Sequence, residues 1–177
     1  LDHDRPIRRQ ADDSVLRVAR GARILLRGGR GRAPHNTALG GDGPAVLALG
    51  AHLKATVTLA WGDLAVTSPH IGDLGDAEAR RRLLETVEDL CRFYRVRPDL
   101  LAADLHPDYG STRVAEALAE RWGVPLVRVQ HHHAHAAAVL VEHGRADGLA
   151  LCWDGLGLGT NDRSWGGELL EVTAGDF

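Results

Sequence analysis

The stretch PLVRVQHHHAHAAAVLVEHG, residues 125–144, decides the fold class of this 177-residue chain. Residues 125–130 predict a strand, and the alanine-rich residues 134–143 predict a helix that ends at Gly144. The histidine run between them therefore lies where a strand ends and a helix begins. In open α/β sheets ligands bind at the carboxyl ends of strands, so this junction is the first candidate for a functional site.

Strands and helices alternate on both sides of this stretch. Helical spacing of apolar residues predicts a helix over residues 76–94, with Asp76 in its first turn. A second helix is expected over residues 111–122, with Ser111 as its N-cap. Apolar runs predict strands over residues 99–105, 148–154 and 165–172.

Three β-rich segments precede the first expected helix. Residues 45–50, 55–62 and 63–69 predict an antiparallel meander, with a tight turn at Trp61-Gly62-Asp63. A meander followed by repeated strand–helix units is typical of an α/β domain with a central mixed sheet.

The first part of the chain has a different pattern. It holds one short strand-like run, residues 23–27, and residues 34–44 look like a linker. We therefore expect two parts, a tail with a linker over residues 1–43 and the α/β domain over residues 44–177.

The composition excludes several classes of protein. The net charge of −3 does not suggest a nucleic-acid or membrane surface, and no apolar run reaches the roughly 18 residues that a membrane span needs. Cys91 and Cys152 lie far apart, so neither a disulfide scaffold nor a structural zinc site is expected, and a reducing cytoplasm is the default location. The chain contains no methionine, which suggests an excised or incomplete chain.

The histidine run has the spacing of a metal site. His131 and His135 are four residues apart, which places both imidazoles on one face of a helix, where they could bind one metal ion. His132 and His133 must point elsewhere, so His132→Ala should cost less metal than His131→Ala. The alternative is a polar helix start with exposed histidines.

The segment WDGLGLGT, residues 153–160, with WGGE at residues 165–168, is the second candidate site. Asp154 ends a strand, and glycines at alternate positions let a backbone approach phosphate oxygens closely. The spacing fits neither a dinucleotide-binding fingerprint nor a Walker loop. A strand, a glycine turn and a strand resemble the phosphate hairpin of actin-like ATPases; the alternative is a flexible hairpin.

Two further junctions carry polar side chains. The segment LHPDYGST, residues 105–112, offers a carboxylate, a phenol, a hydroxyl and free helix N–H groups, which suit an anion or a carbamoyl group. A plain N-cap and a turn would explain it equally well. Lys54 follows the first strand of the meander and could meet a phosphate, although a lone lysine in a turn is more often solvated.

Together, and in this order, these stretches resemble one family. VLALGAHLKAT, SPHIGDL, DLHPDYGSTR, VQHHHAHAAAVLVEHG and WDGLGLGTNDRSWGGE are similar to the successive signature stretches of the HypF carbamoyltransferases, from about Pro44 to the C-terminus. HDRPI and DDSV, near the N-terminus, resemble the closing segment of the preceding YrdC/Sua-type domain. The resemblance implies an actin-like (ribonuclease H-like, ASKHA) first lobe over residues 44–177 and the end of a YrdC-like domain before it.

The resemblance also implies an activity. In this family a carbamoyl group passes from carbamoyl phosphate, through a carbamoyl adenylate made with ATP, to the C-terminal cysteine of a HypE partner. This reaction supplies the cyanide ligands of [NiFe] hydrogenase. ATP with Mg²⁺ and a divalent zinc or iron ion are the implied cofactors.

Site residues follow from the same resemblance. His131 and His135 match the metal pair of the family, and Asp154 is the expected third ligand. Residues expected at the nucleotide phosphates are Gly155, Gly157, Gly159, Thr160, Gly166 and Gly167. Residues expected around the carbamoyl adenylate are Lys54, His106, Asp108 and Tyr109. The chain departs from the family pattern at Ala51, Ala55 and Leu156, where Gly, Asn and Thr are expected.

Three other functions are weighed against this one. The tRNA threonylcarbamoyl transferases share the fold and the metal pair, but HPDYGST and HHHAH favour the HypF family. HDRPI argues against an O-carbamoyltransferase of antibiotic biosynthesis. The third alternative is a non-catalytic metal- or nucleotide-binding module, which is realistic because the second actin-like lobe is missing. We therefore expect this chain alone to bind ATP weakly and to transfer no carbamoyl group.

Overall fold

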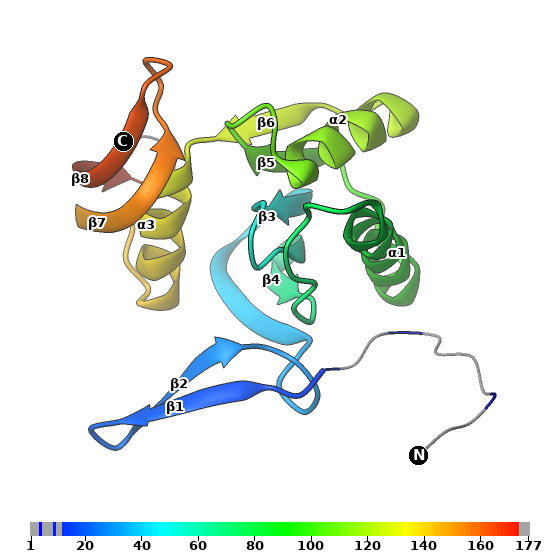
Figure 1. Ribbon diagram of the computed structural model, residues 1–177, viewed down its shortest axis with the longest axis horizontal. Helices are drawn as coiled ribbons and strands as arrows, with labels where there is room; N and C mark the ends of the chain where they lie inside the picture. Colours follow the sequence, from blue (N-terminus) through cyan, green and yellow to red (C-terminus); the bar gives the residue numbers. More distant parts are fainter. Residues whose placement is uncertain (1–3, 5–8, 10–11, 174–177) are drawn as a thin grey trace.

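The computed structural model describes Asp4, Arg9 and residues 12–173, so the HDRPI segment, apart from Asp4, lies outside the described residues. Eight strands and three helices follow one another in this part of the chain (Figure 1). They are β1 (Val15–Ala19), β2 (Ala22–Arg27), β3 (His35–Gly50), β4 (Thr56–Thr67), α1 (Ala77–Tyr94), β5 (Leu100–Asp104), α2 (Gly110–Trp122), β6 (Leu126–Val129), α3 (His131–Glu142), β7 (Asp147–Leu158) and β8 (Ser164–Thr173).

A four-stranded mixed sheet forms the centre of the molecule. Its strand order is β4-β3-β5-β6. β4 runs antiparallel to β3, whereas β5 runs parallel to both β3 and β6. The predicted mixed-sheet α/β class is therefore confirmed, and β3, β5 and β6 end at the same edge of the sheet.

Helices α1 and α2 complete the main core. On α1, Ala79, Leu83, Val87 and Leu90 are buried at helical spacing, and the Asp76 side chain caps the helix by accepting the Ala79 N–H at 2.7 Å. Fully buried leucines of the sheet, among them Leu59 and Leu101, belong to the same cluster. This packing confirms the helix that the sequence predicts over residues 76–94.

The last three elements form a second, smaller packing unit. β7 and β8 pair antiparallel with each other as a separate two-stranded sheet and do not join the central one. α3 covers one face of this hairpin, where Ala136 packs with Cys152 and Val172. Figure 1 shows this unit beside the central sheet, on the side away from α1.

The first hairpin of the predicted meander is confirmed, because residues 46–50 pair antiparallel with residues 56–60, but its second turn and the predicted linker are wrong. Residues 56–67 form the single strand β4, and Gly62, at φ 57°, lies at an irregularity opposite Gly43 instead of in a turn. Of the expected linker, residues 34–44, all but Pro34 belong to β3, since His35 to Ala38 pair with Leu64 to Thr67. Ladder pairing to a long partner strand thus outweighs the glycines of this segment.

One helix cap, one helix start and one turn also differ from the prediction. Tyr109, not Ser111, is the N-cap of α2, and Ser111 is fully buried in the first turn of that helix. α3 begins at His131, three residues earlier than predicted. β7 continues through the expected glycine turn to Leu158, so the chain reverses between Leu158 and Ser164.

Two further observations concern the first two strands and a possible membrane span. The strand β1, which the sequence analysis missed, pairs antiparallel with β2, the strand expected over residues 23–27. Within the described part of the chain, no helix combines the length and the apolar character needed to cross a membrane.

A core substitution tests this packing. Leu83→Ala should lower the free energy of unfolding by about 2–5 kcal/mol, because Leu83 is fully buried and the lost side chain leaves a cavity. Urea unfolding followed by circular dichroism measures the change. Leu53→Ala is the matched control, since Leu53 is 62% exposed. Equal losses in the two variants would contradict the assigned core.

Candidate functional site

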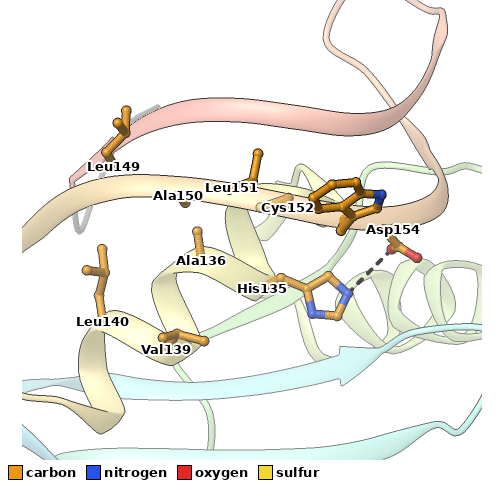
Figure 2. Close-up of a pocket in the computed structure, with 10 residues that line it drawn as sticks. His135, Ala136, Val139, Leu140, Leu149, Ala150, Leu151, Cys152 and Asp154 are labelled. Carbon is orange, nitrogen blue, oxygen red and sulfur yellow. Dashed lines mark ion pairs between the residues drawn. The ribbon is translucent and has the colours of Figure 1, made fainter.

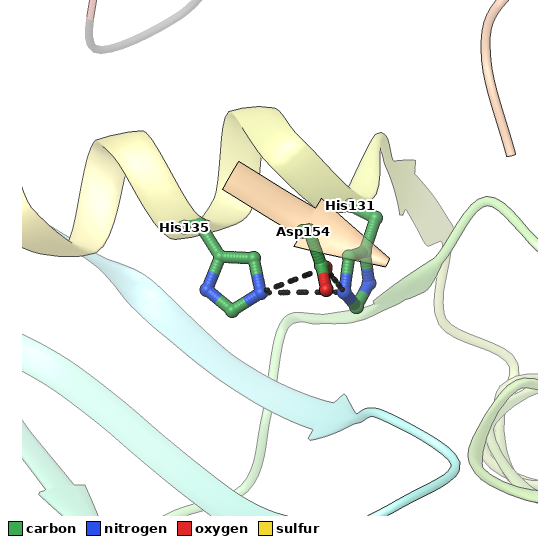
Figure 3. A group of neighbouring side chains, drawn as sticks. All are labelled: His131, His135 and Asp154. Carbon is green, nitrogen blue, oxygen red and sulfur yellow. Dashed lines mark hydrogen bonds and ion pairs between the residues drawn. The ribbon is translucent and has the colours of Figure 1, made fainter. Parts of the chain in front are cut away.

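The site lies where several chain segments meet at one edge of the central sheet. β5 and β6 run parallel, so Asp104, at the end of β5, and His131, just after β6, lie at the same edge. α3 turns away from this edge and carries His135 one turn further on. β7 then brings Asp154 up to both histidines (Figure 3).

Three side chains converge there with their donor atoms close together. His131 Nε2 lies 3.3 Å from His135 Nε2 and 3.0 Å from Asp154 Oδ2. His135 Nε2 lies 3.6 Å from the same carboxylate oxygen. All three donor atoms thus fall within 4.8 Å of one another. The structure therefore brings together the residues that the sequence predicts; their role as metal ligands stays a prediction.

A second carboxylate contacts one of these imidazoles from the side away from the cluster. Asp104 Oδ2 lies 2.6 Å from His131 Nδ1, and this hydrogen bond raises the pKa of His131, against the opposing effect of burial. Burial and the nearby charge of His131 lower the pKa of His135. Asp104 was not among the predicted site residues, although a carboxylate at the end of a parallel strand is a signal that the sequence contains.

A bulge in β7 aims Asp154 at the histidines. Trp153 pairs with Gly167 and Gly157 pairs with Trp165, so three residues of β7 face the single residue Gly166 of β8. Such bulges redirect side chains next to functional sites. Partial burial opposes ionisation of Asp154, but the Gly155 N–H, at 2.6 Å, and the neighbouring imidazoles lower the pKa of this carboxyl.

The buried residues Gln130 and His132 attach the hairpin to α3. The Gln130 amide nitrogen lies 3.0 Å from His132 Nδ1 and donates to Leu158 O at 3.2 Å. Since Nδ1 accepts from the amide, the proton of His132 is on Nε2, which donates to Gly166 O at 3.0 Å. His132 and His133 are both buried, so the alternative of exposed histidines does not hold for these two.

The loop after β5 forms an aromatic stack. The rings of His106 and Tyr109 lie parallel, with centroids 4.3 Å apart, and the His52 ring also stacks on Tyr109, at 5.4 Å between centroids. His52 Nδ1 also accepts the Gly110 N–H at 3.1 Å. Burial, and then the charges of Asp104 and Asp154, raise the pKa of the Tyr109 phenol, which therefore keeps its proton.

Two predicted residues lie apart from this stack. Asp108 is exposed and forms an ion pair with Arg113 at 2.6 Å. Its carboxylate is therefore engaged outside the cluster of His131, His135 and Asp154. Lys54 is exposed in the loop between β3 and β4, where its backbone N–H donates to Asp73 at 3.0 Å. Their roles at a carbamoyl adenylate stay predictions.

The glycines of the hairpin have two different surroundings. A Cβ on Gly157 would lie 2.7 Å from His132 Cε1, and one on Gly159 would clash with the Trp165 ring. Gly155 and Gly167 face open space, and Thr160 is exposed in the turn. Close packing against side chains thus explains two of these glycines.

Three of the six residues expected at the phosphates already have acceptors for their N–H groups. The N–H groups of Gly155, Gly159 and Gly166 donate to Asp154 Oδ1, Arg163 O and Glu168 Oε1, at 2.6, 2.8 and 3.0 Å. A phosphate at this turn would have to displace these acceptors or use other N–H groups. Nucleotide binding here stays a prediction.

An open groove of about 480 Å³ runs between α3 and β7 (Figure 2). His135 and Asp154 lie at one end of it, and the rest of its wall is largely apolar, with Val139, Leu140 and Leu149 among the lining residues. The cluster is therefore open to solvent on the side of His135.

A pair of glycine substitutions tests the packing behind the cluster. Gly157→Ala should lower the free energy of unfolding by about 1–3 kcal/mol, because the new methyl group must displace His132. Gly155→Ala is the matched control, since a Cβ there meets no atom within 4 Å. Urea unfolding of both variants is the measurement, and equal stabilities would show that Gly157 is not closely packed.

Comparison with known proteins identifies the family of this chain. Residues 41–142 match the model of the HypF Kae1-like domain. The chain is 52% identical to carbamoyltransferase HypF2 of Cupriavidus necator, an alignment that covers 99% of this chain and 22% of that protein. It is 47% identical to carbamoyltransferase HypF of Rhizobium leguminosarum, over 97% of this chain and 22% of that protein.

Solved structures give the same result. A crystal structure of full-length HypF in the phosphate- and nucleotide-bound form superposes with a TM-score of 0.89 at 35% identity, covering 98% of this chain and 27% of that one. The chain therefore spans about a quarter or less of the length of the relatives named here. On the matched domain, the sequence identity and the superposition, this chain belongs to the HypF family of carbamoyltransferases.

Proposed function

We propose that this chain carries the metal-binding part of a carbamoyltransferase. The whole protein would pass a carbamoyl group from carbamoyl phosphate, through a carbamoyl adenylate made with ATP and Mg²⁺, to the C-terminal cysteine of a HypE-like acceptor. This step would supply cyanide ligands during [NiFe] hydrogenase maturation. Membership of the HypF family supports the proposal, and the relatives that it rests on are named carbamoyltransferases.

The observation that carries the proposal is the convergence of His131, His135 and Asp154. Two imidazoles and one carboxylate are a donor set that suits zinc and iron. Zn–N bonds of about 2.0–2.1 Å in a tetrahedral site place two nitrogens about 3.3 Å apart. The two Nε2 atoms here lie 3.3 Å apart, a separation that suits one ion.

The surroundings of the cluster suit a small anionic or carbonyl-bearing substrate. An ion held by three protein ligands keeps an open position, where it would polarise a carbonyl or phosphoryl oxygen. The protonated phenol of Tyr109 can donate a hydrogen bond, and Tyr109 lies on the loop that follows Asp104 at the end of β5. The N-terminus of α2, which follows Tyr109 directly, favours negative charge.

The remaining parts of the proposal concern nucleotide, domains and location. We assign the nucleotide phosphates to the hairpin between β7 and β8, and the nucleotide-bound state of a HypF structure supports ATP as a ligand. We assign residues 1–43 to the end of a YrdC-like domain and residues 44–177 to the actin-like lobe. The cysteines Cys91 and Cys152 are both free, which supports a cytoplasmic location.

Substitution of one histidine tests the metal site. His131→Ala should abolish Zn²⁺ binding or weaken it at least 10-fold, an order-of-magnitude expectation, because one of three ligands is lost. Isothermal titration calorimetry with Zn²⁺ on the metal-free chain is the measurement. His143→Ala is the matched control, since His143 caps the far end of α3. Equal affinities in the two variants would contradict the assignment.

The pH dependence of binding tests the same site. Protons and metal compete for His131 Nε2, and the pKa of His131 is raised above 6.5. Competition therefore begins at a higher pH than for an ordinary histidine. The Co²⁺ affinity, followed by visible absorption, should be constant at high pH and should start to fall, as the pH is lowered, at a pH above 6.5. An affinity that stays constant down to pH 6.5 would contradict the Asp104–His131 contact.

Activity should need more polypeptide than this chain. The chain spans 22% of the Cupriavidus necator relative, and three glycine N–H groups of the hairpin already have acceptors. The few remaining contacts to ATP must then offset the loss of translational and rotational freedom on binding, which costs on the order of 4–15 kcal/mol. Calorimetry with ATP and Mg²⁺ should detect weak binding or none, and no carbamoyl transfer should occur. Micromolar ATP affinity of this chain would contradict the expectation.

A further inference from the structure

We propose that Asp104 is a positioning residue that aligns two parts of the site at once: the imidazole of His131 and the loop that carries His106 and Tyr109. The inference rests on the proposed metal-binding function and adds to it a residue that binds neither metal nor substrate. Its carboxylate lies behind His131, on the side away from His135 and Asp154.

Both oxygens of the Asp104 carboxylate are used. Oδ2 lies 2.6 Å from His131 Nδ1, and Oδ1 accepts the backbone N–H of His106 at 2.9 Å. The side chain is only 6% exposed. Burying a carboxylate this deeply costs free energy unless hydrogen bonds replace those to water. These two contacts therefore stabilise the buried side chain of Asp104.

The first contact determines which nitrogen of His131 is free. An ionised carboxylate can only accept hydrogen bonds, so the proton of the neutral imidazole is on Nδ1. Nε2 then keeps its lone pair, and this is the atom that lies 3.0 Å from Asp154 and 3.3 Å from His135 Nε2. Carboxylates orient metal-binding histidines in this way in many proteins.

The second contact fixes the aromatic loop. The N–H of His106 is held by Asp104, and the His106 ring lies parallel to Tyr109 within 2° at 4.3 Å. The position of the Tyr109 phenol therefore depends on the same carboxylate as the tautomer of His131. We infer that binding of a metal ion at the histidines and the geometry of residues 105–110 are coupled through Asp104.

A purely local role would not require both contacts. The bond from the His106 N–H to the Asp104 side chain spans two residues and is an ordinary turn interaction. The bond to His131 reaches across 27 residues to another element, and its acceptor faces the imidazole nitrogen opposite the metal-binding one. A residue that only stabilised the turn would not need a hydrogen bond to that nitrogen.

Asp104→Asn separates these roles, because an amide cannot accept on both sides. If its oxygen faces His131, its NH₂ group meets the His106 N–H, donor against donor. If it is turned round, the NH₂ group donates to His131 Nδ1 and moves the proton to Nε2, the metal-binding nitrogen. Asp99→Asn is the matched control: Asp99 precedes the other end of β5, and its carboxylate accepts the Ala45 N–H at 2.8 Å.

Three measurements on the purified chain test the proposal. Histidine ¹⁵N NMR of the metal-free chain, at an alkaline pH where imidazoles are neutral, reports the tautomer of His131. Calorimetry with Zn²⁺ reports affinity. Amide chemical shifts of residues 105, 106 and 108–110 report the loop, with and without Zn²⁺, since Pro107 has no N–H.

We expect an Nδ1–H tautomer in the wild-type chain, a 10–100-fold loss of Zn²⁺ affinity in Asp104→Asn and no loss in Asp99→Asn. Zn²⁺ should shift the amides of residues 105, 106 and 108–110 in the wild type and not in Asp104→Asn. An Nε2–H tautomer in the wild type, an unchanged affinity in Asp104→Asn, or an equal loss in Asp99→Asn would overturn the proposal. So would a loop that responds to Zn²⁺ in both chains.

This design distinguishes failure of the proposed metal-binding function from failure of the inference about Asp104. If the wild-type chain binds no Zn²⁺, the proposed function fails, whereas the tautomer and the loop shifts of the metal-free chains still test Asp104. If Asp104→Asn does not fold, the wild-type tautomer decides, because an Nε2–H form is incompatible with the contact to Asp104.

Discussion

The buried side-chain amide of Gln130 holds together the two packing units that form the site. Its oxygen caps α3 by accepting the His133 N–H at 2.8 Å, and its nitrogen reaches both His132 Nδ1 and Leu158 O. One side chain therefore fixes where α3 begins, which tautomer His132 adopts and where the β7–β8 hairpin lies. Each buried hydrogen bond left unmade would cost about 1–3 kcal/mol. The start of α3, the tautomer of His132 and the place of the hairpin are therefore determined together.

The geometry of the cluster follows from this junction. With α3 starting at His131, a spacing of four residues places His135 one turn further along the same face. His132, held between Gln130 and Gly166, keeps β8 close, so the bulge in β7 presents Asp154 to both imidazoles. Gly157 permits this close approach because a side chain there would meet His132. The convergence of His131, His135 and Asp154 thus results from the packing of the β7–β8 hairpin on α3.

The sequence predicted some of these features well and others poorly. The helix α1 and the convergence of His131 with His135 follow from periodicity, which is a local property of the chain. The continuation of β3 through residues 35–44 and of β4 through Gly62 depends on ladder pairing between distant segments, and local turn signals pointed the other way. Ser111 likewise looked like an N-cap, but the fold buries it within α2. Asp104 was overlooked because its partner His131 lies on another element.

The central claim is that His131, His135 and Asp154 bind one divalent ion, and anomalous diffraction tests it most directly. A crystal of this chain grown with one equivalent of Zn²⁺, measured at the zinc absorption edge, would locate the ion independently of any activity. We predict a single strong anomalous peak within coordinating distance of both Nε2 atoms and of the Asp154 carboxylate, at about 2.0–2.2 Å. A peak at other side chains, or none at this cluster in crystals that contain zinc, would contradict the account.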